Sequence, residues 1–318
     1  MNNFKKFAVV GSGSWGSAIA AHLARMHELV VIYSDSKEVA DEINNKKANS
    51  RYLESVTLPP NLVATDDIAE VINSEVIFIV VPSHAFGNVL EEMKKHSVPL
   101  TTIFVIATKG ISSNPLELLS ERFRRHFANP FAFFSGPNFA KEVALGKFSS
   151  ATVSSPDLTL ANNLAQKLST PNFEISTTED IITVQISSLV KNMVAIKSGI
   201  LEASGAGENA RAWLITKALQ EILHISSIIG GKPETLLEPA VVGDLILTSY
   251  SKTSRNTKFG FELHQNNYSQ SFISSYSTLV EGVEAAKLVK SFLLKYNIKL
   301  SDLPIINSVV EALQKVNS

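Results

Sequence analysis

The first 180 residues alternate between short apolar runs and segments with helical composition. Seven runs predict β-strands, and they occupy residues 7–10, 29–34, 76–81, 102–107, 131–135, 151–155 and 173–176. The first four are almost uninterrupted by polar residues, which is typical of a parallel sheet covered by helices on both faces. Segments such as GNVLEEMKKH separate most of the strands. This alternation predicts a doubly wound α/β domain.

The pattern changes after residue 180. Residues 181–203 are apolar in almost every direction around a helix, so we expect a helix that is buried on all sides. A second long helix is predicted over 210–229, where Gly230 and Gly231 end it. No strand pattern follows residue 178. We therefore predict two domains, 1–180 and an all-helical 181–318, and a loop over the polar residues 264–277.

The stretch FAVVGSGSWGSAIA near the N-terminus allows two interpretations. A signal peptide would need an unbroken apolar core and a small-residue cleavage site, but glycines and serines interrupt this core. The alternative is a strand, a glycine turn and a helix. Gly11, Gly13 and Gly16 have the spacing G-x-G-x-x-G, which lets a pyrophosphate approach the backbone at a helix N-terminus. The stretch therefore predicts a Rossmann-type dinucleotide-binding domain.

An acidic residue follows the second predicted strand. Asp35 lies 35 − 16 = 19 residues after Gly16, close to the spacing of about 20 for the residue that binds the adenosine ribose. Ser34 and Ser36 could equally line a pocket for a 2′-phosphate. The sequence predicts NAD or NADP as the cofactor and leaves the choice open.

Composition narrows the class of protein. The formal net charge of the 318 residues is −1, which gives no indication of a nucleic-acid partner. The chain has no cysteine, so disulfides, thiol nucleophiles and cysteine-ligated zinc are excluded. No apolar run approaches the roughly 18 residues of a membrane span. We expect a soluble, cytoplasmic protein, and because the histidines show no mutual metal spacing, no metal site.

Lys191 lies inside the apolar helix predicted over 181–203. A buried lysine is costly unless it is paired, and its lowered pKa would suit a general acid/base. The alternative is a lysine that extends from a half-exposed face to water. Asp244, in AVVGDLILT, could be the partner of this lysine or a plain helix N-cap.

Two further segments could bind an anion. Arg255 stands among hydroxyl and amide side chains in TSRNTKFG, and its guanidinium matches the geometry of a phosphate. An exposed, solvated loop is the alternative interpretation. Lys109 follows a predicted strand in ATKG and has the same two interpretations.

Taken in order, the motifs resemble those of one family. GSGSWGSAIA, VPSHAF, ATKG, SGPNFAKE, LVKNMVAIKSG, GENARAWLITKALQE, GDLILT, SRNTKFG and VEG extend over nearly the whole chain. Together they resemble the bacterial NAD(P)-dependent sn-glycerol-3-phosphate dehydrogenases. The resemblance implies interconversion of glycerol 3-phosphate and dihydroxyacetone phosphate, with Lys191 as the proton acceptor. It also implies reduction as the physiological direction, supplying phospholipid synthesis.

The resemblance assigns further residues to the site. Substrate contacts are implied at Lys109, Gly136, Asn138, Lys191, Asp244, Ser254, Arg255 and Asn256. Cofactor contacts are implied at Ser14, Trp15, Ser34, Lys109, Ala140, Arg255, Leu279 and Glu281, beside the three glycines of the turn. Two positions depart from the family pattern: Asn138 stands where threonine or serine is frequent, and Ser34 where a basic residue or histidine is frequent.

Two other functional classes are weighed against this one. Another β-hydroxyacid dehydrogenase, of the 6-phosphogluconate or hydroxyisobutyrate type, would share the architecture and a catalytic lysine, but the SRN and ATKG elements argue against it. A non-enzymatic nucleotide sensor would have little use for a lysine in a buried helix. The sequence leaves the oligomeric state open, with a homodimer as one candidate.

Overall fold

The computed structural model describes residues 4–314, which divide into two compact units. The first unit comprises residues 4–112 and 119–181, and the second comprises 113–118 and 182–314. The chain passes between the units at residues 112/113, 118/119 and 181/182. The short segment 113–118, which belongs to the second unit, was not distinguished from its surroundings by its sequence pattern.

The first unit is built on one eight-stranded sheet in the order β10-β9-β8-β5-β4-β1-β2-β3. All neighbouring strands are parallel except β8 and β9. The strands are β1 (Lys6–Val10), β2 (Leu29–Tyr33), β3 (Leu62–Thr65), β4 (Val76–Ile79), β5 (Ile103–Ile106), β8 (Phe131–Ser135), β9 (Ser149–Ser154) and β10 (Phe173–Thr178). The predicted α/β fold is confirmed.

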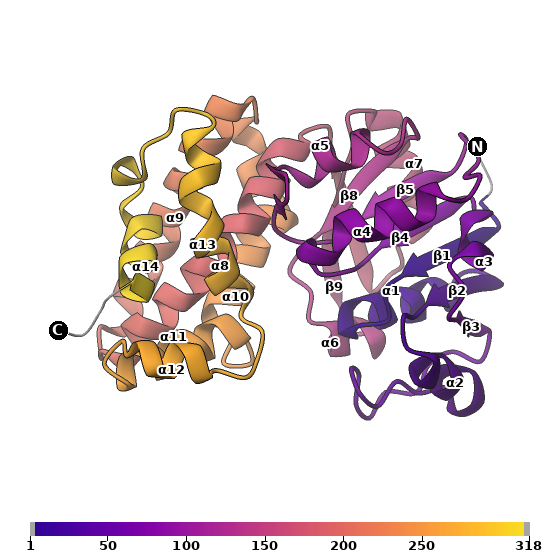
Figure 1. Ribbon diagram of the computed structural model, residues 1–318, viewed down its shortest axis with the longest axis horizontal. Coiled ribbons are helices and arrows are strands. Elements are labelled where there is room, and N and C mark those ends of the chain that lie inside the picture. The colour runs from indigo at the N-terminus through magenta and orange to yellow at the C-terminus, as the bar shows by residue number, and fades with distance from the viewer. Residues whose placement is uncertain (1–3, 315–318) are drawn as a thin grey trace. The chain divides into compact units, whose positions relative to one another are not determined.

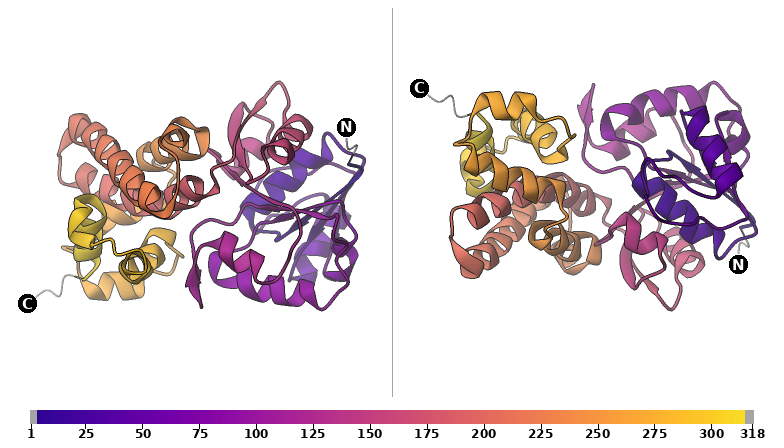
Figure 2. Two further views of the ribbon diagram at one scale, coloured as in Figure 1. Left: turned by 90° about the horizontal axis from the view of Figure 1, so that it is seen from above. Right: turned by 90° about the horizontal axis from the view of Figure 1, so that it is seen from below.

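Helices cover both faces of this sheet, as the strand composition predicted (Figures 1 and 2). They are α1 (Ser14–Ala24), α2 (Lys37–Lys46), α3 (Ala69–Ile72), α4 (Ser83–Lys94), α5 (Leu119–Arg124), α6 (Ala140–Ala144) and α7 (Leu158–Leu168). Helix α1 packs against β1, β2 and α6, and α7 packs against β9 and β10. Because β1, β4, β5 and β8 are parallel, the segments that follow them lie along one edge of the sheet.

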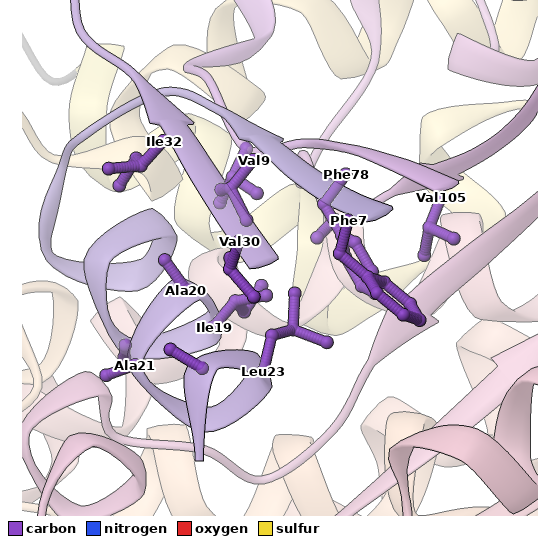
Figure 3. Packing of buried hydrophobic residues seen from close by; sticks show 14 of the residues in the cluster. Phe7, Val9, Ile19, Ala20, Ala21, Leu23, Val30, Ile32, Phe78 and Val105 are labelled. Carbon is purple, nitrogen blue, oxygen red and sulfur yellow. The ribbon is translucent and has the colours of Figure 1, made fainter. Parts of the chain in front are cut away.

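The core of the first unit lies between the central strands and α1. Phe7 and Phe78 are fully buried on neighbouring strands, and Ile19 and Leu23 face them from α1 (Figure 3). Burying a side chain of this size contributes about 1.5–3 kcal/mol. The apolar strands identified in the sequence therefore form the surface against which α1 packs. This packing fixes the position of the glycine turn between β1 and α1.

The second unit is helical apart from one short hairpin. Its helices are α8 (Ile181–Ala203), α9 (Gly207–Ile229), α10 (Asp244–Tyr250), α11 (Arg255–Gln265), α12 (Gln270–Ser275), α13 (Glu281–Leu294) and α14 (Pro304–Gln314). Helical turns of other kinds occupy Pro233–Leu237, Pro239–Gly243 and Leu300–Asp302, and the hairpin strands are β6 (Ser112–Ser113) and β7 (Leu116–Glu117). Helix α8 has the predicted bounds and is buried along most of its length.

The backbones of α11 and α13 approach α8 closely at glycines. A Cβ atom at Gly199 of α8 would lie 2.0 Å from the carbonyl oxygen of Thr257, and one at Gly260 of α11 would lie 2.0 Å from that of Ile196. At Gly282 of α13, a Cβ would lie 2.5 Å from the carbonyl oxygen of Asn192. We refer to Gly199, Gly260 and Gly282 as the α8 glycine contacts.

Three elements differ from the sequence-based expectation. Strand β3 was not predicted, and β7 of the hairpin takes the first two residues of LELLSERFRRHF, a segment with helical composition. The predicted loop over 264–277 is wrong, because α11 continues to Gln265 and α12 follows. Phe272 of α12 stacks on Phe259 with ring centroids 5.7 Å apart, which anchors this otherwise polar helix.

Candidate active site

The glycine turn joins β1 to α1. Gly11 has φ +115°, and a Cβ there would lie 2.3 Å from the carbonyl oxygen of Val80. A Cβ at Gly16 would lie 1.9 Å from the carbonyl oxygen of Gly11. At Gly13, by contrast, no described atom beyond the adjoining residues lies within 4 Å of the Cβ position. The protein's own packing thus requires the first and third glycines, whereas the second leaves open space beside the helix.

That open space suits a pyrophosphate. The N-cap of α1 is Gly13, which has no side chain to accept hydrogen bonds from the first-turn N–H groups. Free N–H groups at a helix N-terminus attract an anion. Ser14 is exposed in this first turn. The neighbouring Trp15 stacks on Phe134, and its buried Nε1 has no hydrogen-bond partner among the described residues. The residues of the turn are therefore suited to a dinucleotide.

Buried hydrogen bonds join the glycine turn to the end of β2 and to the segment after α2. The hydroxyl groups of Ser12 and Ser34 lie 2.7 Å apart, which joins the turn to the end of β2. Asn49 is fully buried and donates from Nδ2 to the Ser12 carbonyl oxygen and to Oγ of Ser17. Asn49 was not identified from the sequence, because an asparagine in a polar segment gives no sign of burial.

The predicted residues after β5 and β8 lie at the same edge of the sheet as the turn. Lys109 is half-buried after β5. A Cβ at Gly136 would lie 2.5 Å from the carbonyl oxygen of Ser150, so a larger residue would not fit there. Asn138 donates to that same oxygen, and its buried Oδ1 has no partner among the described residues. Ala140 is half-buried at the start of α6.

In the second unit, Lys191 and Asp244 form a buried ion pair. The distance from Lys191 Nζ to Asp244 Oδ1 is 2.6 Å, and the two side chains are 4% and 2% exposed. Lys191 Nζ also donates to Oγ1 of Thr248 at 3.2 Å, and this hydroxyl donates to Asp244 Oδ1. The interpretation of Lys191 as a lysine reaching water is therefore wrong. The N-cap interpretation of Asp244 is also wrong, since Gly243 holds that position.

Side chains from three other helices hold α10 in place. Arg211 of α9 donates from Nη2 to the carbonyl oxygen of Ser249 and from Nε to Oγ of Ser198. Ser198 of α8 donates to the same carbonyl oxygen at 2.6 Å, and Thr257 of α11 donates to that of Thr248. These bonds satisfy carbonyl groups at the end of α10, which would otherwise lack partners. They fix the helix that carries Asp244.

Side-chain hydrogen bonds also connect Asn192, the residue directly after Lys191, to Asn256 and Glu281. Asn256 donates from Nδ2 to Oδ1 of Asn192, and Asn192 donates from Nδ2 to Glu281 at 2.8 Å. Asn256 Oδ1 accepts from the backbone N–H of Gly282. The predicted residues Asn256 and Glu281 are thus brought together through Asn192, which was missed although it directly follows Lys191. Leu279, two residues before Glu281, is exposed.

The SRN segment forms the N-terminus of α11. Ser254 is its N-cap, with Oγ accepting from the backbone N–H of Thr257. Arg255 is the first helical residue; it is exposed and makes no ion pair with any described residue. The alternative of an irregular solvated loop is wrong. A guanidinium at a helix N-terminus provides positive charge and N–H donors together, which suits a phosphate.

Between residues 4 and 314, no helix combines the length and apolar character needed to cross a membrane. In the same range, no three histidine, cysteine, aspartate or glutamate side chains are grouped so that they could hold a metal ion.

The fold and the turn place the chain in the class of dinucleotide-binding enzymes, and comparisons with known proteins narrow that class. The family model described as NAD-dependent glycerol-3-phosphate dehydrogenase N-terminus matches residues 6–161, and its C-terminus counterpart matches 180–318. The chain belongs to this family of NAD-dependent glycerol-3-phosphate dehydrogenases.

Individual relatives are similar over almost their whole length. The glycerol-3-phosphate dehydrogenase [NAD(P)+] of Rickettsia bellii is 45% identical, covering 97% of this chain and 98% of the relative. The protein of the same name from Rickettsia typhi is 42% identical and covers 97% of each chain. The crystal structure of glycerol-3-phosphate dehydrogenase from Coxiella burnetii has a TM-score of 0.89 at 32% identity, covering 98% of this chain and 95% of that one.

Proposed function

We propose that this chain interconverts sn-glycerol 3-phosphate and dihydroxyacetone phosphate by hydride transfer with NAD or NADP. Membership of the family supports the substrate pair, and the glycine turn supports the cofactor. The single observation that carries the chemistry is the buried pair of Lys191 and Asp244. A buried charge is costly, so a lysine kept inside an apolar helix points to a use for its proton.

In this proposal, Lys191 moves the proton that accompanies the redox step. A dinucleotide held at the glycine turn would supply the hydride-transfer chemistry for C2 of the substrate. In the reducing direction, Lys191 Nζ donates a proton to the C2 oxygen, which would otherwise become an alkoxide. In the oxidising direction, Nζ takes that proton back. Asp244 holds the ammonium group by charge, and the Thr248 hydroxyl is hydrogen-bonded to both groups.

Arg255 and Asn256 are proposed to hold the substrate phosphate. The exposed guanidinium of Arg255 lies at the N-terminus of α11, where N–H groups also favour an anion. Binding energy from the phosphate, which does not react, would orient C2 for the proton and hydride transfers. Lys109, Gly136 and Asn138 remain proposed substrate contacts of the first unit. The division into a dinucleotide-binding part, 1–180, and a substrate-binding part, 181–318, likewise remains a proposal.

The proposed physiological direction is reduction, which supplies glycerol 3-phosphate for phospholipid synthesis. Cytoplasmic location and a homodimeric state are further proposals from the sequence. Cell fractionation tests the first, and light scattering coupled to size-exclusion chromatography tests the second.

A substrate panel tests the proposed activity. The purified full-length chain is assayed with dihydroxyacetone phosphate, 6-phosphogluconate and 3-hydroxyisobutyrate, each with the reduced or oxidised form of both dinucleotides. We expect turnover with dihydroxyacetone phosphate and with glycerol 3-phosphate in reverse, and none with the two hydroxyacids. Turnover of a hydroxyacid alone would favour the related dehydrogenase class. Dinucleotide binding without turnover of any compound would favour the sensor.

A further inference from the structure

We propose that the end of β2 makes this chain selective for the dinucleotide with a free adenosine 2′-hydroxyl, NAD, over its 2′-phosphorylated counterpart, NADP. The inference rests on the proposed function, since it concerns the same cofactor site. The structure assigns this selectivity to Asp35. Ser34 and Ser36, on either side of it, are the residues that could instead bind a 2′-phosphate, and the structure argues against that role.

The position of Asp35 follows from the sheet. Strand β2 is parallel to β1 with Tyr33 in register with Val10, and the backbone N–H of Gly11 donates to the Tyr33 carbonyl oxygen at 3.1 Å. The end of β2 is therefore directly beside the glycine turn. Asp35 follows two residues later; its side chain is exposed and makes no ion pair with a described residue. A carboxylate at this point can accept hydrogen bonds from ribose hydroxyls.

The protein itself already uses the hydroxyl groups that could receive a 2′-phosphate. Ser34 is fully buried, and its Oγ is bonded to Oγ of Ser12 and accepts from the backbone N–H of Ser36. Ser36 is the N-cap of α2, where its Oγ accepts from the Val39 N–H and donates to a carboxylate oxygen of Glu38 at 2.6 Å. Turning either hydroxyl toward a phosphate would break bonds that fix the turn or the helix.

Four acidic side chains act on the end of β2. The pKa of Tyr33 is raised, first by burial and then by the carboxylates of Asp35, Glu92, Asp66 and Asp67, so these four acidic groups all act on the end of β2. A 2′-phosphate would bring further negative charge among them. Two like charges about 4 Å apart at a protein surface repel each other by about 1–4 kcal/mol, which would weaken the binding of the 2′-phosphate.

Two basic residues in the same region interact with other side chains. Lys37 Nζ lies 3.5 Å from Oδ1 of Asp41. Arg51 lies over the Tyr52 ring, 5.2 Å from its centroid, and its charge acts on Glu38. Neither replaces the arginine that typically receives a 2′-phosphate directly after the second strand of an NADP-binding domain. At that point, this chain has Ser34 and Asp35.

Binding measurements on the full chain test the selectivity without using turnover. Isothermal titration calorimetry gives Kd for NADH and NADPH with the wild type, Asp35→Asn and the control Glu28→Gln, which removes an exposed carboxylate at the opposite end of β2. We expect the wild type to bind NADH roughly tenfold or more tightly than NADPH, a difference of about 1.4 kcal/mol. Asp35→Asn should weaken NADH binding, strengthen NADPH binding and remove most of this ratio, while Glu28→Gln should keep it.

The outcomes separate this inference from the proposed function. Equal or tighter binding of NADPH by the wild type would overturn the selectivity and leave the dehydrogenase proposal standing. An unchanged ratio in a folded Asp35→Asn variant, as judged by its melting curve, would overturn the role of Asp35. Binding of neither dinucleotide would overturn both proposals. A rise in NADPH affinity with added NaCl would support the electrostatic part of the argument, because salt screens exposed charges.

Discussion

The Nζ atom of Lys191 lies 2.6 Å from Oδ1 of Asp244, although 53 residues separate them in the chain and both side chains are almost completely buried. Two opposite charges at this distance, removed from water, stabilise each other only as a pair. The pair therefore links the proton chemistry proposed for the site to the stability of the second unit, and the two contributions can be measured separately.

Replacing Lys191 by methionine tests its role as proton donor. Methionine occupies similar space without a charge, so Lys191→Met should fold and bind dinucleotide normally. Its kcat for dihydroxyacetone phosphate should fall by roughly 10²–10⁴, the usual effect of a positioned general acid. The control is Lys197→Met, which removes a half-buried lysine six residues later on the same helix. Near-normal kcat in a folded Lys191→Met enzyme would end the proposed mechanism.

Asp244→Asn should reduce both activity and stability. The substitution leaves the buried ammonium without its counter-charge, which typically costs about 3–5 kcal/mol. In the double variant Lys191→Met/Asp244→Asn no charge is left unpaired, so part of that stability should return. Urea unfolding of the four proteins measures the coupling. Effects that add to within about 0.5 kcal/mol would show that the two groups act independently.

Arg255→Ala should raise KM for dihydroxyacetone phosphate by an amount that corresponds to about 1.5–3 kcal/mol, the usual contribution of a hydrogen bond to a charged group. Lys258→Ala removes an exposed positive charge from the same helix, but this lysine lies 3.8 Å from Glu262, so its loss should change KM little. Dihydroxyacetone, which has no phosphate, serves as the second control. If Arg255→Ala lowers turnover of both substrates equally, the residue does not bind the phosphate.

Gly13→Val should abolish dinucleotide binding in a protein that still folds. The Cβ of the new side chain would meet no described atom of the protein, but it would occupy the space proposed for the pyrophosphate. Gly16→Val is the matched comparison and should destabilise the protein, since a Cβ there would overlap a carbonyl oxygen. Melting curves and NADH titrations distinguish the two effects. Unchanged NADH affinity in folded Gly13→Val would place the cofactor elsewhere.

His22 should make the stability of the first unit depend on pH. Burial lowers its pKa from 6.5 to about 4, although its ring bonds to the Leu168 carbonyl oxygen. The unfolded chain therefore binds the proton more readily, and the contribution of His22 to stability is complete above pH 6.5 and lost as pH falls toward 4. The loss amounts to about 3 kcal/mol.

His22→Gln keeps a hydrogen-bond donor and cannot be protonated, so its stability should change less with pH in this range. The exposed His84→Gln should behave as the wild type. The free energy of unfolding, measured by urea at several pH values, gives the comparison. Parallel pH curves for the wild type and His22→Gln would contradict the assignment.

The sequence predicted most accurately those elements whose surroundings are uniform. Helix α8 has the predicted bounds because it is buried along most of its length, and its composition is correspondingly apolar. Strand β3 was missed because it has four residues and one of them, Val63, is exposed at the sheet edge. Helix α12 was missed because its polar sequence resembles a loop, and the stacking of Phe272 on Phe259 cannot be read from local composition.

The same distinction applies to the site. A charge within an apolar segment identified Lys191 and Asp244, since burial of a charge is unusual enough to be visible in sequence. Thr248 and Asn192 are neutral and common, so their hydrogen bonds depend on the packing of distant helices. One signal was available for Thr248: it lies four residues after Asp244, on the same face of α10.

The α8 glycine contacts have a consequence for motion in the second unit. At Gly199, Gly260 and Gly282, the main chain of one helix lies so close to that of its neighbour that no side chain fits on the glycine. This packing opposes sliding of α11 and α13 along α8, because a shift by one residue would bring a side chain against the facing carbonyl oxygen. It therefore favours a constant spacing among Lys191, Asn256 and Glu281, which these three helices carry.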